Sequence, residues 1–392
     1  MKILFVHKSY YPAVREGGDT LVLYDVATEL ARMGQDVTVY ATNANADQDL
    51  GPEYIGPRVI QGVKVHFFPR STQWIGRRWY FAHGFAAHLR SHMHDFDIVH
   101  IWHIFGYMTT LTASIARLAG MKYVVSPQAN LSPVALRKNR FVKLVYLHLV
   151  ERMTFRGAAG VQCNTRFDAE WAASVGIPQF KLLPNVTYGI RDMPAHEQAM
   201  KRDRGRYFVF VGRIDPIKGL DFFLRVLALL VHRDKIDCRL VIVGPTSQGY
   251  GTEFAGLVQA GDLTGHVDCR GYVDETEKRH LIEHALCLVL PSYTESFGLV
   301  VAEAMAIGTP VVISDQCNVR EHVEKADCGF VIPHDANLWA RKIKKLMEDS
   351  SLLSELGQRG FAYFKAHLTV ARCAAGLLRN YQMLRIEADT DV

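Results

Sequence analysis

One stretch of sequence decides the fold, Pro291-Ser-Tyr-Thr-Glu-Ser-Phe-Gly-Leu-Val-Val-Ala-Glu-Ala-Met-Ala-Ile-Gly-Thr-Pro310. Apolar strands are predicted on either side of it, at residues 286–290 and 311–314. Between them, residues 299–307 favour a helix that a glycine ends, and every residue of this helix except Glu303 is apolar. A helix between two buried strands is itself largely buried. The carboxylate of Glu303 therefore needs a bonding partner.

Two kinds of partner fit Glu303, namely a basic side chain elsewhere in the core or a ligand that offers hydroxyl groups. The loop before the helix favours the ligand, because a second carboxylate, Glu295, lies eight residues earlier. The same loop brings to the helix start, where an anion is favoured, the backbone N–H groups of Ser296, Phe297, Gly298 and Leu299. Together these groups predict a site for a phosphorylated polyol.

The composition indicates a globular protein of two domains. The chain has 392 residues, of which 49% are hydrophobic and 22% charged, and this length exceeds one ordinary hydrophobic core. The net charge of +5 is a mild basic excess that agrees with anionic ligands or an acidic membrane surface. We expect no nucleic-acid partner.

The cysteines and the N-terminus indicate a cytoplasmic protein. The seven cysteines are scattered without CxxC or Cys/His metal spacing, so we expect reduced thiols and no metal site. Residues 1–6 are predicted to form a strand rather than a signal peptide, because polar residues end the apolar run. No segment reaches the roughly 18 apolar residues of a membrane span. A peripheral position at the inner face of the membrane agrees with these features as well.

Strands and helices alternate along the first 190 residues, which predicts a parallel sheet. We expect a loop over residues 44–62. The helices of this part are predicted at residues 20–33, 108–118 and 131–155, and the strands at residues 2–6, 36–41, 63–68, 96–102, 123–126, 161–164 and 181–184.

The alternation stops at residues 191–206, which have no apolar period and are predicted to be a linker. It resumes over residues 207–368, which we expect to form a second doubly wound domain. Residues 369–392 are predicted to form a terminal helix that crosses back to the first domain. Ligands of such sheets bind at the carboxyl ends of the strands, so we expect a cleft between the domains.

Two cations follow the first strand of the second domain. Arg213 comes directly after Gly212 at the predicted strand end, and Lys218 precedes the next helix. Arginine binds a phosphate in bidentate fashion and lysine acts as a point charge, so the pair suits a diphosphate. The alternative is an exposed loop with two solvated charges.

These motifs resemble those of one large family. Gly212-Arg213 and Lys218-Gly219 are followed by two glutamates separated by seven residues, Glu295 and Glu303. This spacing is the hallmark of the retaining glycosyltransferases of family 4, to which the chain is similar over nearly its whole length. The first domain agrees, because Gly17-Gly18 precede a predicted helix. The resemblance implies an α/β protein of GT-B fold, with two Rossmann-like doubly wound domains that face a central cleft.

The resemblance implies a nucleoside-diphosphate sugar as the donor, held mainly by the second domain. Glu303 would bind the ribose hydroxyls, Arg213 and Lys218 would stabilise the diphosphate as the leaving group, and Glu295 would fix the donor sugar. The candidate catalytic residues are therefore Arg213, Lys218 and Glu295. The donor-binding candidates are Gly17, Gly18, Gly212, Ser296, Phe297, Gly298, Leu299 and Glu303.

The resemblance also implies the type of reaction, which is hexosyl transfer with retention of the anomeric configuration. The departing phosphate helps to deprotonate the acceptor, a glycan or a lipid-linked sugar. Cations and a helix dipole meet the diphosphate charge in place of a metal, so we expect no cofactor. An Asp-x-Asp motif is absent from the place expected for a metal-dependent relative.

The acceptor side departs from the family pattern. Many relatives have a histidine where this chain has Gln128, which can hydrogen-bond a sugar but cannot take up a proton near neutral pH. His103 and Asn130 are further candidates on this side. Because of Gln128, a binding protein of the same fold without turnover is an alternative function. A nucleotide-sugar epimerase or a phosphorylase of the same architecture is another.

Two segments favour either membrane contact or ordinary packing. Residues 131–155 form an apolar to amphipathic helical stretch with Arg137, Lys138, Arg140 and Lys143 near its start. Such a helix binds anionic membranes in some proteins, but more often it packs on a sheet with its charges in solvent. Residues 70–85 mix arginines with aromatic residues, and this patch suits contact with lipid, contact with an acceptor, or packing within the loop.

Overall fold

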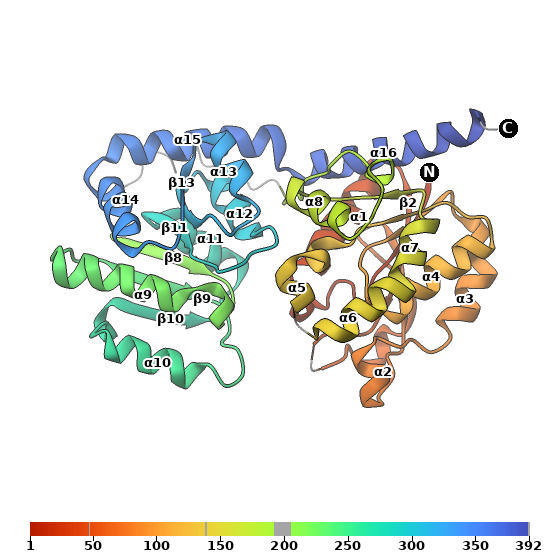
Figure 1. The fold of residues 1–392 in the computed structure, drawn as a ribbon, viewed down its shortest axis with the longest axis horizontal. Coiled ribbons are helices and arrows are strands. Elements are labelled where there is room, and N and C mark those ends of the chain that lie inside the picture. The colour runs from red at the N-terminus through yellow and green to blue at the C-terminus, as the bar shows by residue number, and fades with distance from the viewer. Residues whose placement is uncertain (47, 138, 192–204, 391–392) are drawn as a thin grey trace. The chain divides into compact units, whose positions relative to one another are not determined.

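The computed structural model describes residues 1–46, 48–137, 139–191 and 205–390 (Figure 1). The chain divides into two units. Unit 1 consists of Met1–Arg191 and Val370–Val392, and unit 2 consists of Asp192–Thr369. Most of the predicted linker, residues 192–204, lies outside the described residues.

Unit 2 is built on a parallel sheet. In its described part six strands lie in the order β10-β9-β8-β11-β12-β13. The strand β12, Val311–Ser314, is buried at every position, as expected for a parallel strand covered by helices on both faces. The other strands are β8 Tyr207–Val211, β9 Arg239–Val243, β10 Val267–Gly271, β11 Cys287–Leu290 and β13 Gly329–Ile332.

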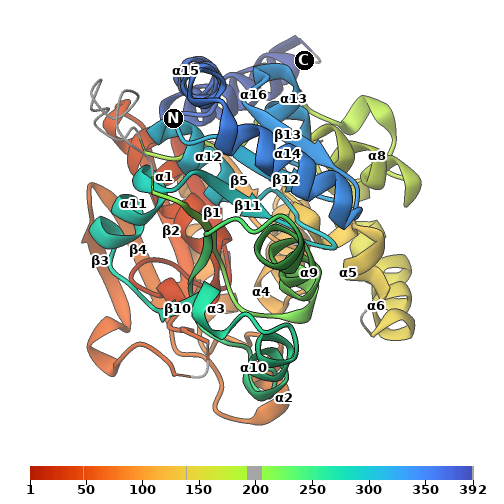
Figure 2. The ribbon, with the colours of Figure 1, turned by 90° about the vertical axis from the view of Figure 1, so that its left-hand side faces the viewer.

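Helices cover both faces of this sheet. From β8 the chain moves to one side of the sheet, and from β11 it moves to the other, so right-handed crossovers place their helices on opposite faces. Accordingly α9 packs against α14, whereas α12 packs against α11 and α15 (Figure 2). The bounds are α9 Leu220–Ala228, α10 Gly251–Ala260, α11 Glu275–His284, α12 Leu299–Ile307, α13 Arg320–Ala326, α14 Ala336–Glu348 and α15 Ser350–His367.

Unit 1 repeats this topology with one addition. Among its described residues seven strands lie in the order β3-β4-β2-β1-β5-β6-β7, and β3 alone in this order is paired antiparallel. The core includes a cluster that extends from Leu4 on β1 to Val161 on β7. The strands are β1 Lys2–Val6, β2 Asp36–Thr42, β3 Gly56–Ile60, β4 Val63–Phe68, β5 Ile98–Ile101, β6 Tyr123–Val125 and β7 Gly160–Val161.

Two helices of unit 1, α1 and α4, begin and end close to the bounds predicted from the sequence, residues 20–33 and 108–118. The bounds of the helices in this unit are α1 Gly18–Arg32, α2 Trp74–Arg78, α3 Phe85–His92, α4 Tyr107–Leu118, α5 Pro133–Arg137, α6 Arg140–Tyr146, α7 Arg152–Gly157, α8 Arg166–Ser174 and α16 Val370–Thr390. In the part of the chain that the structure describes, no helix is long and apolar enough to cross a membrane.

Three predictions for unit 1 are wrong. The expected loop over residues 44–62 contains β3, an edge strand whose Gly56 and Pro57 hide the apolar pattern. The single helix over residues 131–155 is interrupted, because Asn139 adopts a left-handed conformation at φ 57° that an α-helix does not contain. The strand over residues 181–184 is reduced, within the described residues, to one isolated bridge between Leu182 and Val161.

The terminal helix α16 belongs to unit 1 and packs against α1. The buried Tyr381 hydroxyl is 2.5 Å from Nδ1 of His100 on β5, and Nε2 of the same imidazole is 2.7 Å from Oγ of Ser126. Asn380 donates from Nδ2 to Oε1 of Gln162 at 2.6 Å. Burial lowers the pKa of His100 to about 3, so its ring is neutral, and it donates to one of these hydroxyl groups and accepts from the other.

Tyr381→Ala is expected to lower the free energy of unfolding by about 3–5 kcal/mol, because it removes a fully buried ring and leaves Nδ1 of His100 without its partner. Chemical denaturation of the whole chain measures the change. Met383→Ala on the same helix, where the side chain is 46% exposed, is the control and should change it by less than about 0.5 kcal/mol. Equal stability of the two variants would show that α16 does not depend on this contact.

Candidate active site

The loops after β8 and β11 meet where the strand order of unit 2 reverses. These two strands are neighbours in the sheet, and the chain leaves them in opposite directions. The loop after β8 carries Arg213 and Lys218, and the loop after β11 carries Glu295. They are joined by the Tyr293 N–H, which donates to the Ile217 carbonyl at 2.9 Å. Ligands of doubly wound sheets bind at such a reversal point.

An ion pair connects the two loops. Nζ of Lys218 lies 2.5 Å from Oε2 of Glu295, and the two side chains are only 20% and 14% exposed. The other oxygen of Glu295 accepts the Ser296 N–H at 3.1 Å. The backbone of Glu295 also donates to the Gln316 carbonyl and accepts the Asn318 N–H, both in the loop after β12. Three loops therefore fix the position of this carboxylate.

Two glycines allow these loops to approach so closely. Gly219 has φ +66°, and a Cβ placed on it would lie 2.0 Å from the Pro291 carbonyl oxygen. Gly298 has φ +79° directly before α12, where a Cβ would lie 3.0 Å from Leu290. Side chains other than glycine are strained in this conformation. Gly212, which follows β8, donates its N–H to the Val243 carbonyl at 2.8 Å.

The helix α12 has the predicted bounds, and its carboxylate has a basic partner. Oε2 of Glu303 lies 3.1 Å from Nζ of Lys278 on α11, and the Glu303 side chain is 17% exposed. Burial raises the pKa of Glu303, and the charge of Lys278 offsets part of the rise. Of the two partners considered from the sequence, the basic side chain is therefore present in the structure. Lys278 also pairs with Glu275 at 2.9 Å.

The start of α12 contributes backbone groups rather than side chains. Phe297 is 3% exposed, and its ring lies 5.9 Å from that of His322. Leu299 is the first residue of α12, where N–H groups have no acceptor within the helix. The Ser296 N–H does not belong to this open set, because the Glu295 carboxylate already accepts it. The favourable region for an anion is therefore the helix start at Leu299.

Arg213 is exposed at the carboxyl end of β8. Its charge acts on Asp215 in the same loop. Burial raises the pKa of Asp215, but the hydrogen bond from Ser247, the Ile217 N–H and the charges of Arg213 and Lys218 together lower it below its ordinary value. The loop thus combines two cations with a carboxylate whose ionised form they favour.

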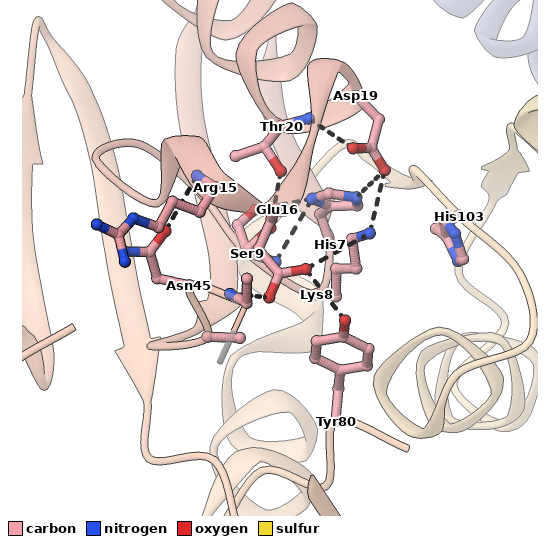
Figure 3. A network of polar contacts seen from close by, with 12 residues as sticks. His7, Lys8, Ser9, Arg15, Glu16, Asp19, Thr20, Asn45, Tyr80 and His103 are labelled. Carbon is pink, nitrogen blue, oxygen red and sulfur yellow. Dashed lines mark hydrogen bonds and ion pairs between the residues drawn. The ribbon is translucent and has the colours of Figure 1, made fainter. Parts of the chain in front are cut away.

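A second polar cluster follows β1 in unit 1 (Figure 3). The side chains of His7 and Lys8 converge on Asp19, with His7 Nε2 at 3.3 Å and Lys8 Nζ at 3.4 Å from Oδ2. Lys8 Nζ is also 3.7 Å from Oε2 of Glu16, which accepts the Tyr80 hydroxyl at 3.0 Å. Although burial opposes ionisation, His7, Lys8 and His103 hold the pKa of Asp19 well below its ordinary range.

The glycine pair lies within this cluster. Gly17 has φ +122° and caps α1, which begins at Gly18, and Asp19 is in the first turn. The acidic group at the helix start is favoured by the backbone N–H groups there. Gly17 and Gly18 therefore lie at the junction of a loop and a helix, and charged contacts hold Glu16 and Asp19 on either side of the pair.

The three acceptor-side candidates are only partly brought together. Nδ2 of Asn130 lies 3.3 Å from Nε2 of His103 and donates to the Pro127 carbonyl. Gln128 is 7% exposed, and its Oε1 accepts from Asn164 at 3.0 Å. Within the described residues, no hydrogen bond reaches Nε2 of Gln128. His103 and Asn130 thus form one contact, and Gln128 is engaged by a different partner.

A buried glutamate supports the loop that follows His103. Glu151 is 1% exposed, and its Oε1 accepts the Phe105 N–H at 2.6 Å. Phe105 has the left-handed φ of +62°, a conformation that needs such support. Glu151 lies in a turn of π-helix, Leu147–Glu151, a form that is frequent at functional sites. Burial raises the pKa of this carboxyl to about 7.

Both halves of the chain match models of known families. The family described as "Glycosyl transferases group 1" matches residues 194–362, and that described as "Glycosyl transferase 4-like domain" matches residues 17–185. Together the two matches span most of the chain. The chain belongs to the group 1 glycosyltransferases.

Named relatives of this group 1 glycosyltransferase match part of its length. It is 31% identical over 193 residues to a D-inositol 3-phosphate glycosyltransferase of Streptomyces bingchenggensis. This match covers 45% of this chain and 42% of the relative. It is 38% identical over 151 residues to a phosphatidyl-myo-inositol mannosyltransferase of Mycolicibacterium smegmatis, 38% of each chain. The chain thus spans less than half the length of these curated relatives.

Solved structures establish the fold of this group 1 glycosyltransferase. The structure of Anabaena HepE in complex with UDP and glucose superposes with a TM-score of 0.73 at 19% identity, over 97% of this chain and 98% of that one. The two α/β sheets described above therefore have the GT-B architecture, and the predicted fold and family are confirmed.

Sequence reasoning missed Lys278, Lys8 and Asp19. Lys278 lies on a helix remote in sequence from Glu303, and nothing in a single sequence indicates that the two are in contact. Lys8 and Asp19 carried a signal, because both flank the predicted glycine loop after the first strand.

In the described residues, no group of three or more histidine, cysteine or acidic side chains has a geometry that could hold a metal ion.

Gly219→Ala is expected to destabilise unit 2, because a Cβ would lie 2.0 Å from the Pro291 carbonyl oxygen. The left-handed backbone alone costs at least about 1 kcal/mol for a residue with a Cβ. Denaturation of the purified chain measures the loss. Gly256→Ala in α10 is the matched control, because a Cβ there meets nothing within 4 Å. That control should be neutral or slightly stabilising.

Glu151 is expected to make the stability of unit 1 depend on pH. Its folded pKa of about 7 lies above the ordinary value of 4.5, so the folded state retains a proton that the unfolded state has released. The stabilisation is complete below the ordinary pKa and is lost as the pH rises through 7, by on the order of 3 kcal/mol in total. Glu151→Gln does not ionise, so its free energy of unfolding should vary less over this range.

Denaturation of wild type and Glu151→Gln from about pH 5 to about pH 8 measures this difference. Glu170→Gln on α8, whose side chain is 58% exposed, is the control and should follow the wild type. Parallel pH profiles for all three proteins would contradict a raised pKa at Glu151.

Proposed function

We propose that this chain is a retaining hexosyltransferase that moves a sugar from a nucleoside-diphosphate sugar to a glycan or lipid-linked acceptor. The observation that carries the proposal is the joining of the loops after β8 and β11 through Lys218 and Glu295. This places two cations, a fixed carboxylate and the start of α12 together at the reversal point of the sheet. Such a set suits a sugar diphosphate.

The comparisons support a sugar nucleotide as the donor. The named relatives are glycosyltransferases that act on inositol phosphate or phosphatidyl-inositol, and the HepE structure holds UDP and glucose. By analogy, we assign this chain to the synthesis of a cell-surface polysaccharide or glycolipid. Its place of action would be the cytoplasm, at the inner face of the membrane.

We assign the main donor contacts to residues of unit 2. Glu303 binds the ribose hydroxyls, and Lys278 pairs with its carboxylate. Arg213 and the start of α12 meet the charge of the diphosphate, together with Lys218. Glu295 binds hydroxyls of the donor sugar. Because these groups supply positive charge at the leaving group, the proposed mechanism needs no metal ion or other cofactor.

The proposed reaction is a front-face substitution. The acceptor hydroxyl oxygen bonds to the anomeric carbon on the face from which the diphosphate oxygen departs, and its proton passes to the departing phosphate. Lys218 and Arg213 stabilise the negative charge that develops on that phosphate. No side chain has to act as a general base, so Gln128 in place of the usual histidine is compatible with turnover.

The acceptor side is assigned to unit 1. His103 and Asn130, already in contact, would bind acceptor hydroxyls, and Gln128, whose Nε2 is buried, is the third candidate on this side. Gly17 and Gly18 would allow backbone approach to the donor phosphates.

Three alternatives lead to different expectations. A binding protein without turnover keeps the donor contacts but not the acceptor contacts. The glutamate pair argues against an epimerase, and a phosphorylase would be recognised by its need for phosphate.

Binding and turnover of a panel of uridine, guanosine and adenosine diphosphate sugars test this proposal. One donor is expected to bind in calorimetry and to be hydrolysed slowly, since water can replace the acceptor. Glu303→Gln should weaken donor binding at least about tenfold, because an amide accepts fewer hydrogen bonds from the ribose and carries no charge. Glu355→Gln on α15, whose side chain is 54% exposed, is the control.

The outcomes separate the alternatives. Binding without hydrolysis or transfer would favour the binding protein, and release of a sugar phosphate only in the presence of inorganic phosphate would favour the phosphorylase. Wild-type donor affinity in Glu303→Gln would contradict the ribose contact. The absence of binding by every donor in the panel would overturn the proposed function as a whole.

A further inference from the structure

An apolar stripe is exposed on the helical segment of unit 1 that follows the acceptor-side loop. It consists of Phe141, Val145, Leu149 and Met153, which recur at intervals of four residues through α6, the turn of π-helix and α7. Their exposed fractions are 81%, 41%, 67% and 51%. Helical side chains at this spacing lie along one face, so the stripe is continuous. The segment is coloured yellow in Figure 1.

A shallow hollow of about 470 Å³ lies beside the stripe. It is lined by Trp79 and by apolar and aromatic side chains of α6 and the turn of π-helix. Trp79 packs on Tyr146 with their ring centroids 5.3 Å apart, which holds the indole at the edge of the hollow. Tryptophan and tyrosine are the side chains that membrane proteins place at the level of the lipid headgroups.

The exposed charged side chains of the segment that carries the stripe have one sign. Residues 128–157 contain six lysines and arginines and one acidic residue, Glu151. That glutamate is 1% exposed and bonded to the backbone of Phe105, so it offers no negative charge at the surface. The arginines that are exposed within the described part of this segment are Arg137, Arg140, Arg152 and Arg156.

Ordinary surface packing does not account for this combination. A solvated helix face carries charged and polar side chains, whereas this one presents a phenylalanine and a leucine that are more than half exposed. The apolar side chains alone would suit a protein partner. The surrounding arginines, with no exposed acidic group among them, favour a surface that is both apolar and negatively charged.

We propose that α6, the turn of π-helix and α7 lie on an anionic lipid bilayer, with the apolar stripe at the boundary of the acyl chains and the arginines at the headgroups. The contact keeps unit 1 at a surface where a lipid-linked acceptor would be found. It requires no donor, so it stands apart from the proposed transfer activity.

Cosedimentation of the full-length chain with vesicles tests the proposal, without any sugar nucleotide. The protein is expected to bind vesicles that contain phosphatidylglycerol, and to bind vesicles of pure phosphatidylcholine much more weakly. High salt should reduce binding, because the arginines act through a screened surface potential. The double variant Phe141→Ser, Leu149→Ser should bind the anionic vesicles roughly tenfold less or weaker still.

Two controls make the result specific. Val59→Ser on β3, at the opposite edge of the sheet, removes a side chain that is 70% exposed and should bind like the wild type. Arg140→Glu, Arg152→Glu should lose binding while the apolar stripe is intact. Thermal unfolding of each variant checks that it is folded, which is expected because the altered side chains are exposed.

Three results would overturn the proposal. The first is that the wild type stays in solution with anionic vesicles at low salt. The second is that the double serine variant binds as the wild type does. The third is that sedimentation velocity shows a dimer that the double serine variant dissociates, because the stripe would then be an interface between two copies of the chain. A failure here leaves the donor-binding results unaffected.

Discussion

The ion pair of Lys218 and Glu295 is the contact on which the candidate site depends. Together with the hydrogen bond from the Tyr293 N–H to the Ile217 carbonyl, it joins the loops after β8 and β11, two neighbouring strands from which the chain leaves in opposite directions. An exposed ion pair contributes only about 0–1 kcal/mol to stability, and partial burial adds a desolvation cost. The role of this pair is therefore to fix the positions of the two side chains. The approach also requires Gly219, whose missing side chain leaves room for the Pro291 carbonyl.

Both units pair a lysine with a carboxylate in the loops beside the point where the strand order reverses. In unit 2 a lysine and a glutamate pair in the loops that follow the strands beside the reversal point. In unit 1 the loop after β1 and the first turn of α1 hold Lys8 between Glu16 and Asp19, and β1 is likewise the strand from which the order reverses. Charges that are paired and partly buried are fixed in position, so they can orient a polar ligand without first being ordered themselves.

The helical segment of unit 1 carries different chemistry on its two sides. Its buried side holds Glu151, which supports the loop after His103 through the Phe105 N–H. Its exposed side presents Phe141 and Leu149 to solvent. The turn of π-helix, Leu147–Glu151, contains both Leu149 and Glu151, and its hydrogen bonds span five residues instead of four. One segment thus combines a buried carboxylate that supports the loop after His103 with an exposed apolar stripe.

The sequence by itself determined the fold class, most of the strands and the two glutamates, because apolar periodicity and glycine positions are local signals that a single chain displays. It did not reveal β3, an edge strand whose proline and glycine break the pattern, nor the interruption at Asn139. Only the tertiary structure decided which groups pair. Lys278 meets Glu303 because α11 and α12 pack together, and side chains remote in sequence come into contact only when their helices do.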